Sequence, residues 1–270
     1  MTARPPARRD GPGSAGGPVG DRAVSDLVGF VLIFGLVVSV VAIVSVVGLD
    51  SLESARDAER TNNVERAFEV LSNNFDDVAA RGAPSRATEI SLDGNAISVE
   101  EPIRVEIRDP DSGAGDPSFL ESRTFKPRPI VYDAGNTQLV YVMGAVFRAE
   151  REGGVVLESW SPVLDGQRTY FPVVNTKSAT DTVQSVQSST VLVRSISNQR
   201  VVELANESAS FDDVRINVTS PRRDLWLQML EERPELTCTT TGPQTVKCQL
   251  GYVPDRIYVV DNRIAVDVET

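Results

Sequence analysis

The sequence predicts an α+β protein, with a long N-terminal transmembrane and amphipathic helix followed by a mostly antiparallel β domain with one late helix. Three observations predict this class. An uncharged stretch runs from Leu27 to Leu49. An apolar stripe with helical spacing follows it. From Ala87 onward, apolar and polar residues alternate with a period of two, as in half-buried strands.

The uncharged stretch predicts a membrane span at residues 24–49. As a helix it is about 35 Å long, enough to cross the hydrocarbon core of a bilayer. The alternative is a cleaved secretory signal. Such a signal normally has an apolar region of about 7–15 residues with an A-x-A cleavage site, and none follows Leu49.

The charges around the span predict its orientation. Arginines outnumber acidic residues before it, whereas acidic residues outnumber arginines just after it. By the positive-inside rule the N-terminus is cytoplasmic and the C-terminal domain lies outside the cell membrane. We therefore expect a disordered cytoplasmic leader (1–23), the span (24–49), an amphipathic helix that continues it (50–82) and a β-rich exterior domain (83–270).

The extramembrane part has recognisable helix and turn signals. The helical stripe consists of Val64, Phe68, Leu71, Phe75 and Val78, and Gly82 and Pro84 end it. Asp93-Gly94-Asn95 predicts a hairpin between strands at 88–92 and 96–99. A second hairpin is expected from 138–150 to 155–160 around Gly153-Gly154, and a turn at Asp261-Asn262. Ser220-Pro221 predicts the start of a helix at 222–232.

The composition argues against most catalytic and nucleic-acid-binding classes. The chain has no histidine, which removes the commonest general base and metal ligand. Its two cysteines cannot form a Cys₄ zinc site. The net charge of −11 is unsuited to binding phosphates. We find no nucleophile or phosphate-binding motif, so the sequence predicts no enzyme, no cofactor, no metal and no nucleic-acid partner.

Three smaller features concern the exterior domain. Cys238 and Cys248 are placed symmetrically about Pro243 and predict a cross-strand disulfide, the alternative being two buried thiols. Asn206 and Asn217 begin acceptor sequons for N-glycosylation, relevant only on an exported domain. The acidic loop with Asp109, Asp111 and Asp116 lacks the EF-hand order, so a solvated loop is preferred to a calcium site.

The residues before the span resemble a known processing signal. Arg22-Ala23, followed by Val24-Ser25-Asp26-Leu27-Val28-Gly29, resembles the class III signal sequence of archaeal type IV pilins and archaellins. The resemblance implies that a prepilin peptidase cuts between Ala23 and Val24, leaving the apolar helix on the mature protein. Many haloarchaeal pilins have Ser-Pro-Val-Ile-Gly here, and Asp26 replaces the proline.

Together these features predict a non-enzymatic, type IV pilin-like cell-surface protein that is a subunit or minor subunit of a filament. Its expected partners are the lipid bilayer, a prepilin peptidase and other pilin-like subunits. The alternative is an unprocessed single-pass membrane protein with a structural or binding ectodomain. An exported enzyme is a third alternative.

The acidic, lysine-poor surface predicts a halophilic protein, the alternative being an ordinary acidic protein from a GC-rich genome. Only Lys126, Lys177 and Lys247 are lysines among 27 basic residues. In molar salt the Debye length is about 3 Å, which screens the self-repulsion of acidic groups. We therefore expect the exterior domain to unfold or expand when salt is diluted, as measured by circular dichroism. An unchanged spectrum at low salt would contradict the halophilic interpretation.

Overall fold

A computed structural model describes residues 20–109, 122–151, 153–179, 184–206 and 213–270 of the chain. Within these ranges, the side chains of 20–26, 50, 53, 54, 57, 184 and 204–206 are not described. The chain divides into two compact units, Met1–Glu59 and Arg60–Thr270. A single helix, α1 (Gly20–Ala79), contributes to both.

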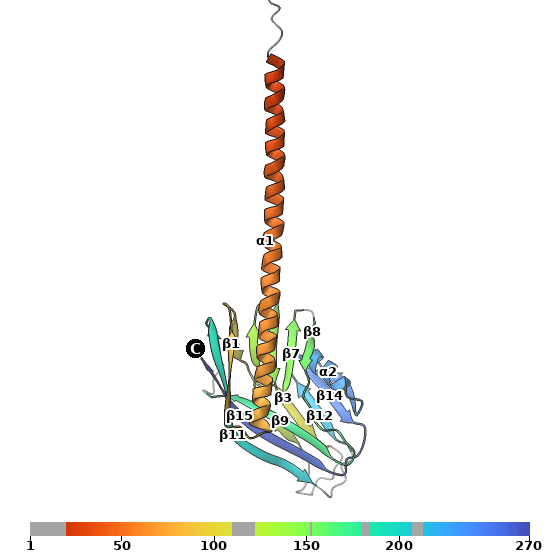
Figure 1. The fold of residues 1–270 in the computed structure, drawn as a ribbon. Helices are drawn as coiled ribbons and strands as arrows, with labels where there is room; N and C mark the ends of the chain where they lie inside the picture. Colours follow the sequence, from red (N-terminus) through yellow and green to blue (C-terminus); the bar gives the residue numbers. More distant parts are fainter. Residues whose placement is uncertain (1–19, 110–121, 152, 180–183, 207–212) are drawn as a thin grey trace, which may run out of the picture. The chain divides into compact units, whose positions relative to one another are not determined.

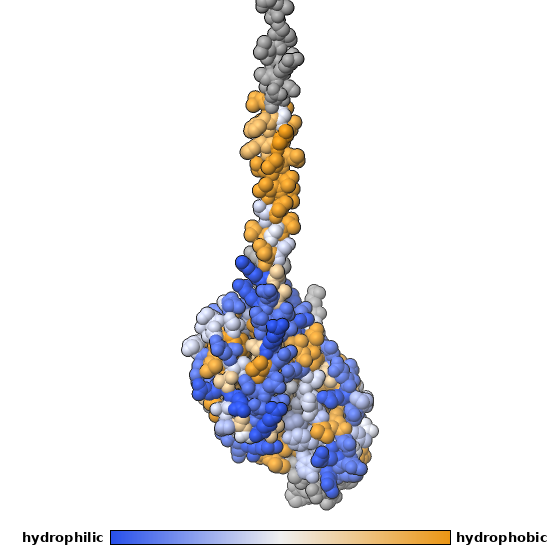
Figure 2. Space-filling view, in the orientation of Figure 1, coloured by the Kyte–Doolittle hydropathy of each residue, from blue (hydrophilic) through white to orange (hydrophobic). Residues whose placement is uncertain are grey.

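The first unit contains the apolar stretch of α1. Residues Leu27–Leu49 form one helix that is long and apolar enough to cross a membrane, and none of this stretch is buried. Figure 2 shows hydrophobic side chains covering the visible surface of this segment. This helix is consistent with single-pass membrane anchoring, and a signal sequence near the N-terminus would have the same character.

The second unit begins with the amphipathic part of α1. The expected stripe of Val64, Phe68, Leu71, Phe75 and Val78 is buried along one side of the helix, which confirms the helical periodicity. The chain then turns at Gly82, whose φ of 77° is readily adopted only by glycine.

In the described part of the chain, three sheets follow, and their strand pairs are antiparallel except for one. The first sheet has the order β1 (Ser85–Ser91), β11 (Thr190–Asn206), β15 (Ile257–Glu269) and β9 (Thr169–Ser178), with β15 and β9 parallel. The second has the order β10 (Gln184–Gln187), β2 (Ala96–Val99), β5 (Ile130–Asp133), β6 (Thr137–Val142), β7 (Ala145–Glu150) and β8 (Gly153–Glu158). The third has the order β13 (Leu236–Thr241), β14 (Thr245–Leu250), β12 (Arg215–Thr219), β3 (Arg104–Arg108) and β4 (Arg123–Phe125). With the late helix α2 (Arg223–Glu231), this confirms the predicted α+β class.

The six-stranded sheet is the central layer of the second unit, because both of its faces are buried. On β5 and β6, Ile130, Tyr132, Leu139 and Tyr141 join the core beneath α1, whereas Val131, Val140 and Val142 join a second core. Figure 1 shows the end of α1 lying across the sheets. The second core is closed by the five-stranded sheet and α2.

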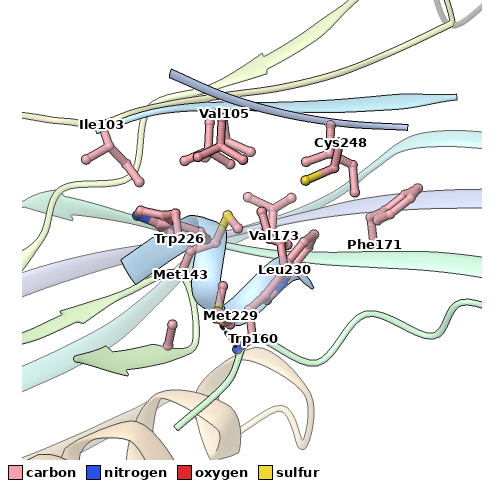
Figure 3. Close-up of a cluster of buried hydrophobic side chains, with 14 of the residues drawn as sticks. Ile103, Val105, Met143, Trp160, Phe171, Val173, Trp226, Met229, Leu230 and Cys248 are labelled. Atoms are coloured by element: carbon pink, nitrogen blue, oxygen red, sulfur yellow. Dashed lines mark hydrogen bonds between the residues drawn. The ribbon is translucent and has the colours of Figure 1, made fainter. Parts of the chain in front are cut away.

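Helix α2 fills the second core with large side chains. Leu225, Trp226, Met229 and Leu230 are its buried residues, as the sequence predicted for one face of this helix. Figure 3 shows Trp226, Met229 and Leu230 close to Met143 and Trp160. The backbone N–H of Trp160 donates to the sulfur of Met229, and its indole N–H donates to the carbonyl of Pro172.

Of the two expected hairpins, the one around Gly153-Gly154 is confirmed, since β7 and β8 pair antiparallel, although its first strand was expected to be too long. The other is wrong in its pairing. The strands on either side of Asp93-Gly94-Asn95 lie in different sheets, because β1 pairs with β11 and β2 pairs with β5 and β10. Residues 138–150 are two strands instead of one. A two-residue turn at Met143-Gly144 separates them, with φ values of 54° and 82°. This turn was missed because methionine is unusual at a position that needs positive φ.

The expected turn at Asp261-Asn262 and the expected start of α2 also need correction. Asp261 and Asn262 form no turn: they lie inside the continuous strand β15, buried between β11 and β9. At α2, Arg222 occupies the N-cap position, and Ser220 instead accepts a hydrogen bond from the Arg222 N–H just before the helix.

The buried stripe of α1 should contribute strongly to stability. Phe68→Ala removes a fully buried ring and should lower the free energy of unfolding by about 3–5 kcal/mol. Val70→Ala on the same helix is the control: this side chain is 52% exposed, and a change within about 0.5 kcal/mol is expected. Urea unfolding of the full chain in detergent, monitored by tryptophan fluorescence, measures the change in free energy for each substitution. Equal effects of the two substitutions would contradict the described packing.

Candidate functional site

The residues of the expected processing signal lie at the start of α1. The backbone of Arg22, Ala23 and Val24 is helical, and their side chains lie outside the described residues. From there α1 continues without interruption to Ala79. The apolar segment and the helical part of the β-rich unit are therefore consecutive stretches of one helix.

The predicted disulfide is present. Cys238 and Cys248 are bonded to each other and face one another in the register of the β13–β14 hairpin. Cys248 is buried in the second core, and Cys238 packs against that core. The bond therefore fixes an edge strand, β13, to its sheet.

The two sequons differ in their surroundings. Asn217 lies on β12 between β14 and β3, is 7% exposed and donates a hydrogen bond from its amide to Glu106. Such burial is unfavourable for a bulky glycan. Asn206 ends β11, and its side chain lies outside the described residues. Glycosylation at both positions stays a prediction.

The acidic loop is only partly described. Asp109 is buried, whereas Asp111 and Asp116 lie outside the described residues. In the part of the chain that the structure describes, no group of three or more His, Cys, Asp or Glu side chains could hold a metal ion.

Sequence reasoning missed a cavity of about 560 Å³ within the second unit. We call it the acidic cavity. Its walls come from α1, the β6–β7 turn, the end of β8, β9 and β15. Carboxylates line it from two sides, Asp76 on α1 and Glu158 at the end of β8. Only the tertiary fold brings these elements together, so no local pattern in the sequence indicates the cavity.

The two carboxyl groups of the acidic cavity influence each other. Burial raises the pKa of Glu158, which accepts a hydrogen bond from Ser72, and the charges of Glu69 and Asp76 raise it further. Burial also raises the pKa of Asp76. The positive charge of Arg81 opposes this change, and the negative charge of Asp77 reinforces it. Both carboxylates add to the effect of burial, which raises the pKa of Tyr141 well above its usual range.

Together, the fold and these features define, over the described residues, a protein with one membrane-length N-terminal helix and a disulfide-bonded, β-rich unit. Residues 22–267 match the model of DUF7289, a family of unknown function, and the chain belongs to that family. The match includes both the apolar helix and nearly all of the β-rich unit. No curated protein and no solved structure matches the chain.

Removal of the disulfide should destabilise the second unit without unfolding α2. The bond closes a short loop, with a sequence separation of 10 between the two cysteines. A loop of this length is expected to raise the free energy of unfolding by about 2–3 kcal/mol. Cys238→Ser/Cys248→Ser should therefore lower the melting temperature. A reductant should lower the melting temperature of the wild-type protein only. A reductant-induced shift of the same size in the double variant would contradict this assignment.

The acidic cavity should make stability depend on pH. In the folded state, the pKa values of Asp76 and Glu158 lie above the ordinary values of 3.8 and 4.5. At pH values between the ordinary and the raised pKa, the folded state therefore binds more protons than the unfolded state. The stability that these two carboxyl groups contribute is thus fully present at pH values below their ordinary pKa values. It is lost as the pH rises through their raised pKa values in the folded state.

The double variant Asp76→Asn/Glu158→Gln isolates this contribution. Its free energy of unfolding relative to wild type should increase as the pH rises from the ordinary pKa values through the raised ones, as measured by urea unfolding. Groups with lowered pKa values, such as Glu106, occur in both proteins and cancel in the difference. A difference that does not change with pH would be the contrary result.

Proposed function

We propose that this chain is a non-enzymatic, type IV pilin-like protein of the cell surface, anchored in the membrane by Leu27–Leu49. In this proposal a prepilin peptidase cuts between Ala23 and Val24, and the mature helix joins those of other pilin-like subunits. The N-terminus faces the cytoplasm and Arg60–Thr270 lies outside.

The continuity of α1 is the observation that carries the proposal. A secretory peptidase acting after Leu49 would cut inside an uninterrupted helix, whereas a cut before Val24 leaves almost all of it intact. The last part of the same helix supplies buried core residues to the β-rich unit. A retained apolar helix therefore stays covalently joined to a folded domain, as a filament subunit requires.

Three further observations support the proposal. The family match starts at Arg22, so it includes the basic–small pair and the apolar segment. The disulfide suits an oxidising location outside the cell. Glycine and serine residues within the span, including Gly35 and Ser39, leave room for close helix packing, which membrane helices use for association.

The processing step can be tested with one arginine. Arg22→Gln should leave most of the protein with its leader, because the basic residue beside the cut site is lost. Arg9→Gln removes the same charge farther upstream and should be processed normally. Peptide mass mapping of protein isolated from native membranes identifies the N-terminal residue, which should be Val24 in wild type and in the control.

Either of two results would contradict the proposal. Wild-type protein that retains Met1 would be an unprocessed single-pass membrane protein. A new N-terminus beyond Leu49 would instead identify the apolar segment as a removed secretory signal.

A further inference from the structure

We infer that a pocket lined by β4, β9, β11 and β15 binds a hydroxylated organic anion, a carboxylate carried on a sugar-like body. The pocket lies in the β-rich unit and has a volume of about 440 Å³. We call it the basic pocket. The inference goes beyond the proposed function, since it depends neither on leader removal nor on filament assembly. It rests on unpaired cations, on polar groups at core-facing positions and on the chemistry of the walls.

The basic pocket concentrates positive charge on an acidic chain. The chain has a net charge of −11 and only three lysines, and two of them, Lys126 and Lys177, line this pocket. Arg123 and Arg263 line it as well. These four residues come from three segments that are far apart in the sequence, so the fold brings their charges together.

The acidic groups of the basic pocket are already paired. Arg263 bonds both carboxylates of the described wall, Asp261 at 2.7 Å and Glu203 at 3.2 Å. The other three basic side chains of the pocket form no ion pair and no side-chain hydrogen bond with any described residue. Three cations are thus left without an anionic partner, which the carboxylate of a ligand would supply.

Arg123 and Asn175 occupy positions that face the second core. On β4, Arg123 lies opposite Ile107 and two residues before Phe125, so it shares a sheet face with these buried side chains. On β9, Asn175 comes two residues after Val173, which also belongs to the second core. The basic pocket therefore lies where the apolar packing of this core ends and polar groups replace it.

Asn175 is an independent indication of a ligand. The residue lines the basic pocket and is only 7% exposed. Its Oδ1 is fully buried, whereas its Nδ2 retains accessible surface and donates no hydrogen bond to a described residue. A largely buried amide donor without a partner is costly. Because Asn175 lines the pocket, its free N–H groups are available there to the oxygen atoms of an anion.

The size and the walls of the pocket favour a hydroxylated ligand over a bare oxyanion. The volume of about 440 Å³ lies within the range of small-molecule sites, about 300–1,000 Å³. A bare oxyanion fills only the space of about two or three water molecules, each about 30 Å³. Ser122 and Thr124 add hydroxyl groups to the described wall, and Phe125, the one apolar residue of that wall, is buried in the second core. Such walls suit the hydroxyl groups of a sugar better than an aliphatic chain.

Ligand titration of the full chain in detergent micelles, at constant ionic strength, tests the inference. D-glucuronate is the probe and D-glucose its uncharged analogue, and ligand-observed NMR measures both affinities. Glucuronate should bind at least about tenfold more tightly than glucose. Lys126→Gln/Lys177→Gln should weaken glucuronate binding at least about tenfold. Both lysines are exposed, so this double variant should fold as wild type does.

Lys247→Gln is the matched control for Lys177→Gln. It removes the same charge from the third lysine, which lies on β14 and does not line the pocket. Its affinity for glucuronate should remain within about twofold of wild type, whereas Lys177→Gln should weaken binding at least about threefold. Asn175→Leu removes the amide without changing the net charge and should also weaken binding at least about threefold. Circular dichroism verifies that each variant is folded, and the lysine variants test the inference if Asn175→Leu is not.

Methyl β-D-glucuronide and sodium sulfate distinguish the kinds of anion. Binding of the methyl glycoside as tightly as glucuronate supports an acidic sugar within a glycan, and binding of glucuronate alone supports a small free acid. Tighter binding of sulfate than of glucuronate would overturn the inference, because the pocket would then be a simple oxyanion site. Equal binding of glucuronate and glucose, or unchanged binding by folded Asn175→Leu, would also overturn it. Equal weakening by Lys247→Gln and Lys177→Gln would do the same, because attraction would then reflect net charge alone.

Discussion

The burial of one side of α1 is the interaction on which the rest of the β-rich unit depends. Phe68, Leu71 and Phe75 fill the space between the helix and the four- and six-stranded sheets, and the Phe75 ring lies 4.5 Å from that of Tyr141. Without this stripe, one face of the six-stranded sheet would expose its apolar side chains to water. The helix thus contributes a membrane-length segment and half of a soluble core in a single element.

The second core also depends on the packing of α1, because the six-stranded sheet contributes side chains to both cores. Because β5, β6 and β7 carry apolar side chains on both faces, each strand contributes to the packing under α1 and to the packing around Trp226. The long strands β9 and β15 also contribute to both cores. The acidic cavity lies where the two cores approach each other, with Met143 and Trp160 from one and Val174 from the other.

Arginine–carboxylate pairs give the acidic surface much of its local order. Arg263 bonds both Asp261 and Glu203, and Arg222 links α2 to Glu100 through two hydrogen bonds. The planar guanidinium suits such contacts better than the lysine ammonium does.

The sequence by itself determined the elements whose signals are local: the membrane-length helix, the stripe from Val64 to Val78, the buried face of α2 and the pairing of Cys238 with Cys248. Strand partners were decided only by the tertiary structure. Ser85 pairs with Ile196, a contact that no turn between neighbouring strands could indicate. Asp261-Asn262 has the composition of a turn, but Arg263 and the strands on both sides hold it extended and buried. Periodicity and turn chemistry report on neighbouring residues, whereas pairing and the cavity arise from contacts between distant ones.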